Sequence, residues 1–270
     1  YDVELIISYG FFLTIFGFLD DRISLNFNIK LICIIIPSIF LILNGFELNT
    51  LGDYEYIGTI NLGKFNIIFT LLAVGLLINA YNYVDGVDGL LSSLLITTLL
   101  YIVFLIDNEN VINLLLLIII PLAINLIFNL LPAKNGWKIF LGDCGSLFLG
   151  FFASFLIIYI SKFENIHPAY LIWSCWYPVY DFLYVTSKRL INKKGFYKPD
   201  NSHFHHTILK YLKSDHYKTI IFINSLNIFI LYSGYLVTKY LGYLHSLIMF
   251  VIMYFIFWAL RDNKFKKNLK

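Results

Sequence analysis

Long apolar stretches fill most of the chain, and short polar breaks separate them. Because roughly 17–25 apolar residues in a helix are long enough to cross a bilayer, each stretch predicts a transmembrane helix. Breaks such as Asp107-Asn108-Glu109-Asn110 carry the charge and turn chemistry expected between spans. The nine predicted spans lie near residues 3–19, 29–45, 64–80, 89–106, 111–131, 145–161, 168–187, 219–238 and 243–260.

The composition points to the same class of protein. Of the 270 residues, 59% are hydrophobic and 14% are charged, whereas a soluble domain carries about 25% charged residues. So few charges cannot cover the surface of a soluble protein of this size, which argues against a large soluble helical core. Because we find no repeat and no second domain, we predict an all-α polytopic integral membrane protein with a single transmembrane domain, residues 1–270.

The cysteines and the first residue carry less information. Cys33, Cys144 and Cys175 lie far apart and show no CxxC spacing, so we expect reduced packing residues and no disulfide framework. The chain begins with Tyr1, and no basic segment with a small-residue cleavage site follows it. We therefore expect some upstream sequence to be missing.

The distribution of basic residues predicts the orientation. If the chain alternates across the membrane at nine spans, 17 of the 20 Lys and Arg residues fall on one side. Only Lys64, Lys162 and Lys239 fall on the other side. The positive-inside rule makes the basic side cytoplasmic, together with the C-terminus. This pattern predicts a multi-pass membrane protein with its basic loops in the cytoplasm.

Four polar clusters interrupt the apolar sequence, and all of them map to the cytoplasmic ends of predicted spans. They are the stretches 17–22 (GFLDDR), 79–90 (NAYNYVDGVDGL) and 140–146 (FLGDCGS), and the region from Asp181 to His206. Ionisable groups near membrane depth are costly and usually functional. We therefore expect an active site at the cytoplasmic face.

Converging carboxylates in these clusters predict a divalent cation. Carboxylates that meet in a partly dry site repel one another, and a hard cation removes that penalty. Mg²⁺ suits the role because it takes one or two carboxylates and keeps waters and phosphate oxygens. The carboxylates at or near membrane depth are Asp20, Asp21, Asp85, Asp88, Asp143 and Asp181.

The first two clusters each have a structural alternative. Asp20 and Asp21 are adjacent, so on a regular helix they point about 100° apart; they could simply form a solvated helix end. Asp85 and Asp88 are three residues apart and share a helix face if the glycines that follow them do not break the helix. That segment could instead be a hydrogen-bonded seam between helices.

The third cluster and the basic loop also allow two interpretations. Asp143 lies in a Gly-Asp-x-Gly-Ser turn that opens a helix, where free N–H groups favour phosphate; the alternative is an N-cap. A His-x-His-His segment lies near Lys193, Lys194 and Lys198. It resembles an anion clamp more than a Zn²⁺ site, because no fourth ligand is evident, and it could also be a surface group without function. The positive-inside bias alone could explain Lys188 and Arg189.

Taken together, the four ordered motifs resemble the polyprenyl-phosphate N-acetylhexosamine-1-phosphate transferases. The match runs from Asp20 to His206, and its Pro-Asp-x-x-His-x-His-His form is similar to the branch that initiates O-antigen, common-antigen and teichoic-acid synthesis. Family members have about ten or eleven spans, so one or two N-terminal helices are expected to be absent here. The resemblance makes residues 1–270 a transmembrane catalytic domain.

The resemblance also implies roles for individual residues. Catalytic roles fall to Asp20, Asp21, Asp85, Asp88, His205 and His206, and the metal ligands would be Asp143 and Asp20. The expected substrate-binding residues are Asn82, Asp88, Phe140, Gly145, Ser146, Arg189, His203, His205 and His206. In this scheme Asp88 lies near the uracil of the donor, Phe140 stacks on it, and the histidines meet its diphosphate and sugar.

The implied reaction transfers a sugar 1-phosphate from a UDP-N-acetylhexosamine to undecaprenyl phosphate with Mg²⁺, or with Mn²⁺ as an alternative, and releases UMP. We expect direct in-line attack, with an aspartyl-phosphate intermediate as the other possibility. The expected partners are the two substrates and the bilayer, with no nucleic acid; a homodimer is left open. The alternative function is a secondary transporter, which would need its carboxylates near the bilayer midplane.

Overall fold

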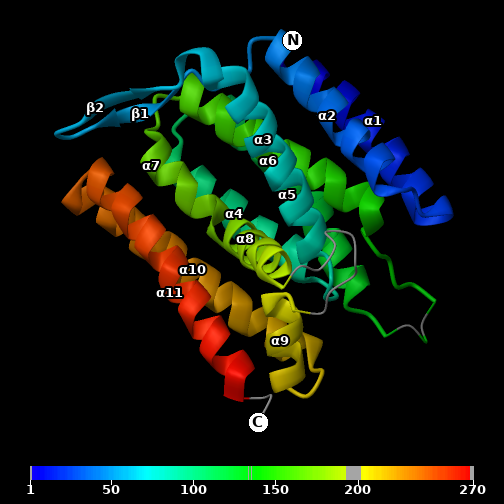
Figure 1. Cartoon of the computed structure of the whole chain (residues 1–270). Coiled ribbons are helices and arrows are strands. Elements are labelled where there is room, and N and C mark those ends of the chain that lie inside the picture. The colour runs from blue at the N-terminus through cyan, green and yellow to red at the C-terminus, as the bar shows by residue number, and fades with distance from the viewer. Residues whose placement is uncertain (1, 133, 135, 193–201, 268–270) are drawn as a thin grey trace.

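The computed structural model describes residues 2–132, 134, 136–192 and 202–267, which form a helical bundle with a small hairpin at one end (Figure 1). The elements are α1 (Asp2–Ile23), α2 (Phe27–Leu43), β1 (Thr50–Tyr54), β2 (Gly58–Asn61), η1 (Gly63–Phe65), α3 (Asn66–Val84), α4 (Leu90–Leu105), α5 (Glu109–Asn129), α6 (Gly142–Phe163), α7 (Pro168–Leu171), η3 (Ile172–Cys175), α8 (Trp176–Ile191), α9 (Phe204–Tyr211), α10 (His216–Leu241) and α11 (Tyr243–Lys267).

Each predicted span contains a helix, so the all-α expectation is confirmed for the described part of the chain. Five of these segments are long and apolar enough to cross a membrane, judged by length and composition. They are Gly63–Val84, Glu109–Asn129, Gly142–Phe163, His216–Leu241 and Tyr243–Asp262. The chain is therefore a membrane protein by its helices, while nine crossings and the orientation stay predictions.

The seventh predicted span is not one continuous helix. It divides into α7, the 3₁₀ turn η3 and α8. Pro168 occupies the first turn of α7 and Pro178 the first turn of α8. Proline is tolerated there because the N–H groups of a first turn have no partner within the helix. The prolines therefore favour two successive helix starts over one long helix.

Helix α6 lies at the centre of the bundle, packed against α1 on one side and α3 on the other (Figure 1). Two glycines permit these close approaches. A Cβ at Gly17 of α1 would lie 2.5 Å from the backbone of Asp143, and a Cβ at Gly150 would lie 2.7 Å from the Cα of Ile78. The closeness of α1, α3 and α6 brings the acidic motifs together.

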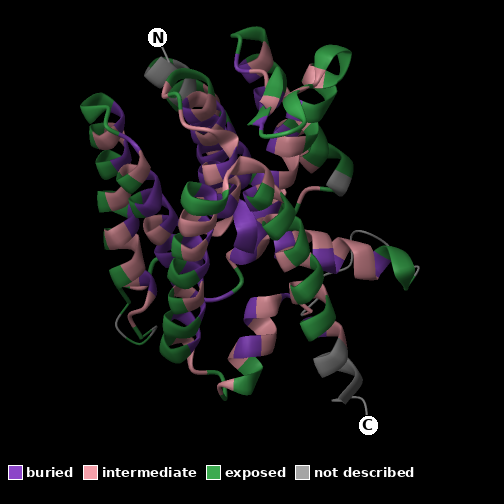
Figure 2. Cartoon of the chain, turned by 90° about the vertical axis from the view of Figure 1, so that its left-hand side faces the viewer, coloured by how far each residue is buried: buried purple, intermediate pink, exposed green. Residues whose placement is uncertain are grey.

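The outward faces of the bundle are apolar, and the buried residues lie along its middle (Figure 2). Helix α5, for example, exposes Leu117, Ile120 and Ile127. Only 17% of the most apolar window of α5 and 6% of that of α11 is buried within the chain. Such surfaces are favourable against lipid and unfavourable in water.

The hairpin β1–β2 was not predicted from the sequence. Both carboxylate oxygens of Glu55 accept N–H bonds of 2.8 Å from the start of α11, at Tyr243 and Leu244. The His167 ring contacts the Asp53 carbonyl over 2.8 Å. The hairpin therefore joins α11 and the start of α7, at the end of the bundle opposite the acidic motifs.

Candidate active site

The start of α6 is held against the end of α1 by Asp21. The Asp143 amide donates to Asp21 Oδ1 over 3.1 Å, and the Cys144 amide donates to Oδ2 over 3.4 Å. These amides are among the N–H groups that a helix start leaves without internal partners. A carboxylate from α1 thus caps α6, and its negative charge is favourable at this positive helix end.

Asn82 of α3 fixes the Asp143 side chain from the other side. Its Nδ2 donates to Asp143 Oδ1 and to Ser146 Oγ, both over 2.8 Å. Asn79, one turn earlier, instead donates to the carbonyl of Gly75 in its own helix. The two asparagines therefore have different partners, and of the two only Asn82 reaches the acidic group.

Lys30 lies between two of the predicted carboxylates. Its ammonium forms an ion pair with the buried Asp20 and lies 3.6 Å from Asp143 Oδ2. The Leu25 amide donates to the other oxygen of Asp20 over 2.8 Å. Asp20 and Asp143 therefore approach one another around a shared cation.

Asp85 and Asp88 do not share a helix face, because the helix breaks at this segment and the condition for that expectation is not met. Helix α3 ends at Val84, and α4 begins only after Gly89, whose φ of 72° favours glycine. The two carboxylates thus lie on a turn between helices. Burial and the nearby charges of Asp143, Asp21 and Asp88 raise the pKa of Asp85 to about 7. The turn consequently faces the acidic group of α1 and α6.

Asp88 makes a second, more open group of contacts. Its Oδ2 lies 2.5 Å from Lys138 Nζ and 3.2 Å from Nδ1 of His216, the first residue of α10. Lys138 Nζ also lies 5.0 Å from the ring centroid of Phe140, which is exposed. An exposed aromatic face beside a carboxylate can stack a planar base while the carboxylate accepts its N–H bonds.

The histidine segment is anchored by Asp181 of α8. One oxygen of Asp181 lies 2.7 Å from His203 Nδ1, and the other accepts bonds from the Phe204 amide and from Arg261 Nη1, at 2.8 and 2.6 Å. Asp181, His203 and Arg261 are all buried. Asp181 therefore holds His203, and His203 positions the histidine segment. The Arg261 guanidinium and the His203 ring are the partners that offset the buried negative charge of Asp181.

His205 and His206 face the turn between α3 and α4. A Cβ at Gly86 would lie 2.7 Å from His205 Nε2 and 3.0 Å from His206 Nε2, so the rings lie against the bare backbone of this glycine. Among the described residues, neither ring nitrogen of the fully buried His205 has a hydrogen-bond partner. Burial lowers its pKa to about 3 and also lowers the pKa of His206. Both shifts favour the neutral form of the rings.

Comparison with known proteins agrees with this arrangement of motifs. The profile described as glycosyl transferase family 4 matches residues 4–161, more than half of the chain. The chain belongs to glycosyl transferase family 4. The matched region holds the contacts between Asp21, Asn82 and Asp143, and it ends before the histidine segment.

Curated relatives of this family member carry one function in their names. The undecaprenyl-phosphate alpha-N-acetylglucosaminyl 1-phosphate transferase of Yersinia pestis is 29% identical over 201 residues, which cover 72% of this chain and 55% of the relative. The protein of that name in Escherichia coli K12 is 28% identical over 204 residues, 73% and 56% of the two chains.

A third relative comes from Bacillus subtilis. It is named a probable undecaprenyl-phosphate N-acetylglucosaminyl 1-phosphate transferase and is 28% identical over 210 residues, 75% of this chain and 57% of its own. The chain thus matches little more than half the length of these relatives.

The remaining predicted residues of this family 4 member lie around the same end of the bundle. Gly145 and Ser146 are in the first turn of α6, and Ser146 donates to the Gly142 carbonyl. The guanidinium of the buried Arg189 lies 5.9 Å from the ring of Tyr83, and that ring lies 5.3 Å from the ring of His203. The predicted clamp residues Lys193, Lys194 and Lys198 lie outside the described residues.

Sequence reasoning missed the cationic partners of the family 4 carboxylates. It counted Lys30, Lys138 and Arg261 only as part of the positive-inside bias, and it did not single out His216. The spacing of Lys138, two residues before Phe140, was a usable signal for one of them. Nothing in the local sequence marks Arg261, because its partner lies 80 residues earlier in the chain.

The carboxylates around Asp143 supply some of the ligands that a bound Mg²⁺ needs, and water and phosphate would supply the others. Among the described residues, no three His, Cys, Asp or Glu side chains come close enough to form a metal site without further ligands. Asp20 and Asp143 nevertheless present hard oxygen donors to one cation, the ammonium of Lys30. One or two carboxylates completed by water and phosphate are what Mg²⁺ commonly uses, so the donor set fits this ion.

Proposed function

We propose that this member of glycosyl transferase family 4 transfers N-acetylhexosamine 1-phosphate from a UDP-sugar to undecaprenyl phosphate. The observation that carries the proposal is the meeting of acidic motifs from α1, the turn after α3, and α6. The names of the curated relatives support the same transfer and favour N-acetylglucosamine as the sugar.

The proposed donor site lies between the turn after α3 and the segment before α6. Phe140 would stack on the uracil, and Asp88 would accept hydrogen bonds from the base. His205 and His206 lie against Gly86 of the same turn, where neutral rings can donate hydrogen bonds to the diphosphate or the sugar. The donor would thus extend from Phe140 toward the histidines.

The proposed acceptor site lies beside α1 and α2, where Lys30 can neutralise a phosphate. An acceptor phosphate oxygen would attack the phosphorus attached to the sugar. A new P–O bond forms, the P–O bond to UMP breaks, and UMP leaves with its bridging oxygen. Since the second pKa of a phosphomonoester is about 6, the acceptor needs little activation. Asp20 or Asp21 would remove any residual proton, so direct attack is favoured over an aspartyl-phosphate.

Asp143 and Asp20 would hold Mg²⁺ in this proposal, with Mn²⁺ as a substitute. When bound, the ion would neutralise charge on the diphosphate. Asn82 would keep the Asp143 oxygen in place, and the cap by Asp21 would keep the start of α6 facing the substrates. The active site would lie at the cytoplasmic face of the bacterial inner membrane, where a water-soluble donor and a lipid acceptor can meet.

The test is release of UMP from UDP-sugars by the natural full-length protein in detergent. We expect release that depends on both undecaprenyl phosphate and Mg²⁺, and we expect Asp143→Asn to abolish it while the thermal unfolding midpoint stays near that of wild type. A panel of UDP-GlcNAc, UDP-GalNAc and deoxy-sugar donors identifies the sugar.

A negative result is equally informative. If UDP-sugar enters proteoliposomes without any UMP release, the protein is a transporter and the proposal is wrong. Capture of a phosphorylated enzyme with donor alone would replace direct attack with a covalent route. Full activity of Asp143→Asn would remove this residue from metal binding.

A further inference from the structure

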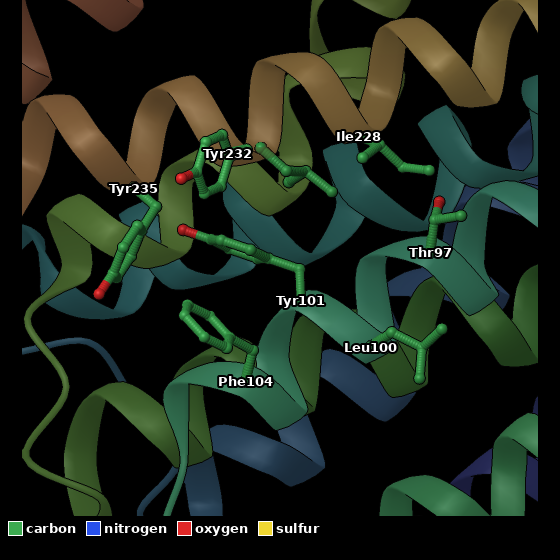
Figure 3. Close-up of a pocket in the computed structure, with 8 residues that line it drawn as sticks. Thr97, Leu100, Tyr101, Phe104, Ile228, Tyr232 and Tyr235 are labelled. Carbon is green, nitrogen blue, oxygen red and sulfur yellow. The ribbon is translucent and has the colours of Figure 1, made fainter.

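A narrow groove of about 360 Å³ lies between α4 and α10, in a part of the bundle that the proposed reaction does not use (Figure 3). At one end the rings of Tyr101, Phe104, Tyr232 and Tyr235 gather, and at the other end lie Leu100 and Ile228. Tyr232, Leu100 and Phe104 are exposed, so the groove opens on the outer surface of the bundle.

The walls of the groove are largely apolar, and two of their polar groups have partners elsewhere. The Thr97 hydroxyl donates to the Leu94 carbonyl over 2.8 Å and accepts from Asn227 over 2.7 Å. The Tyr101 hydroxyl donates to the Tyr170 carbonyl over 3.0 Å. These two groups offer a ligand little hydrogen bonding, so the groove suits an alkyl chain and not a sugar or a nucleotide.

The groove lies in the half of the bundle remote from the acidic group. Helix α10 begins at His216, which contacts Asp88, and runs away from it without a break. At 1.5 Å per residue, Tyr235 lies roughly 28 Å along the helix from His216. A lipid in the groove would therefore belong to the leaflet at the far end.

A single lysine stands at that end of the groove. The exposed Lys239 lies one turn beyond Tyr235, and its ammonium is 5.5 Å from the Tyr235 ring centroid and 5.7 Å from that of Tyr240. None of the ion pairs among the described residues includes Lys239. A cation without a carboxylate partner at the mouth of an apolar groove matches a lipid with an anionic headgroup.

Basic residues are scarce on the side of the membrane where Lys239 is predicted to lie. Of the 20 Lys and Arg residues, only Lys64, Lys162 and Lys239 fall on the side predicted to be external. Lys162 is occupied by the Gly45 carbonyl. Lys239 lies beside the groove, on a side where the positive-inside rule disfavours basic residues. A binding role would account for its position.

We propose that the groove binds one acyl chain of an anionic phospholipid from this leaflet, with the lipid phosphate at Lys239. This lipid is distinct from the reacting acceptor, because its phosphate would lie roughly 35 Å from His216 along α10. It would join α4 to α10, the helices that begin beside the proposed donor site. The proposal holds whether or not the proposed reaction is correct.

The test is lipid binding to the delipidated, natural full-length protein in detergent, followed by native mass spectrometry and thermal unfolding. We expect phosphatidylglycerol to be retained at least about tenfold better than phosphatidylcholine and to raise the unfolding midpoint. Leu100→Trp, which fills the groove, should abolish retention. Lys239→Gln should remove the preference for the anionic lipid while some retention remains.

Matched controls separate the groove from the general surface. Leu117→Trp changes an exposed leucine of α5, and Lys64→Gln removes another lysine of the same side, so both should behave as wild type. Ile228→Trp fills the groove from α10 and takes the place of Leu100→Trp if that variant does not fold. Wild-type retention by both tryptophan variants would overturn the proposal, as would an unchanged lipid preference in Lys239→Gln. Efficient disulfide crosslinking of Leu100→Cys between two copies in native membranes would instead assign the groove to a dimer.

Discussion

The side-chain amide of Asn82 donates a 2.8 Å hydrogen bond to the carboxylate of Asp143, although 61 residues separate the two in the chain. The bond joins the end of α3 to the start of α6, two helices that pack against one another. It turns one oxygen of Asp143 toward α3 and leaves the other toward Lys30. The orientation of the proposed metal ligand is therefore set by a neutral partner.

Removal of this partner gives the first prediction. Asn82→Ala should lower turnover by about 10–100-fold, because residues that orient a metal ligand commonly have effects of that size. The apparent affinity for Mg²⁺ should fall as well, and a Mg²⁺ titration of UMP release measures it. Asn79→Ala is the control, since in the described part of the chain the Asn79 side chain bonds within its own helix; equal losses in both variants would contradict the assignment.

The contact between Gly86 and the histidines gives the second prediction. Gly86→Ala places a methyl group where His205 and His206 now lie, so one of the partners must move. A displacement of about 1 Å at a reacting group can reduce turnover on the order of 100-fold. UMP release should fall by that order while the thermal unfolding midpoint changes little.

The matched control is Gly75→Ala in α3. A Cβ at this position meets only Ile34, at 3.9 Å. Because alanine favours helix over glycine, this variant should be active and slightly more stable. If Gly86→Ala were as active as Gly75→Ala, the histidines would have no close role at the turn.

The raised pKa of Asp85 predicts a dependence of stability on pH. In the folded protein its pKa is about 7, because of burial and neighbouring carboxylates, against 3.8 as the ordinary value. Between these values the folded state holds a proton that the unfolded state has lost, so stability falls as pH rises from about 4 to 7 and then levels off. Asp85→Asn removes this penalty.

We expect Asp85→Asn in EDTA to unfold at the same temperature as wild type near pH 4 and at a higher temperature at pH 8. The gain at pH 8 should be on the order of 2–4 kcal/mol. Differential scanning fluorimetry at a series of pH values measures the difference. A stability gain that does not vary with pH would show that Asp85 is not the titrating group.

The buried pair of Asp181 and Arg261 gives a double-mutant prediction. Arg261→Met leaves the Asp181 charge buried beside His203 alone, and breaking a buried pair in this way costs about 3–5 kcal/mol. Asp181→Leu with Arg261→Met removes the stranded charge and should recover part of the stability. Chemical denaturation in detergent measures both.

Activity separates structure from function in this pair. The double variant lacks the carboxylate that holds His203 and the Phe204 amide, so its turnover should stay low even where its stability recovers. Recovery of turnover together with stability would mean that the position of the histidine segment does not depend on Asp181.

The sequence predicted the helices well because bilayer thickness fixes the length of an apolar run. It missed the division of the seventh span, since prolines in first turns interrupt a helix without interrupting the apolar pattern. The hairpin β1–β2 was missed because its anchors, Glu55 and His167, bind the backbone of other elements. Such contacts exist only in the folded chain.

In the candidate site, too, some residues could be predicted from the sequence and others could not. Asp143 and Asn82 could be selected as candidates because polar groups at membrane depth are few and stand out in the sequence. The partners Lys30 and Arg261 were missed because every basic residue on that face obeys the same topological bias. Only the fold decides which of those residues meets a buried carboxylate.

The anchoring of His203 has a consequence for biogenesis. The buried cation that completes the Asp181 anchor is Arg261, near the end of α11, so translation has passed all of α1 to α10 before it appears. A nascent chain already inserted through α10 would contain Asp181 and its bonds to His203 and the Phe204 amide, without the cation that compensates the buried carboxylate. Compensation of this buried charge would therefore be a late step of assembly, completed only when the last described helix packs against α8.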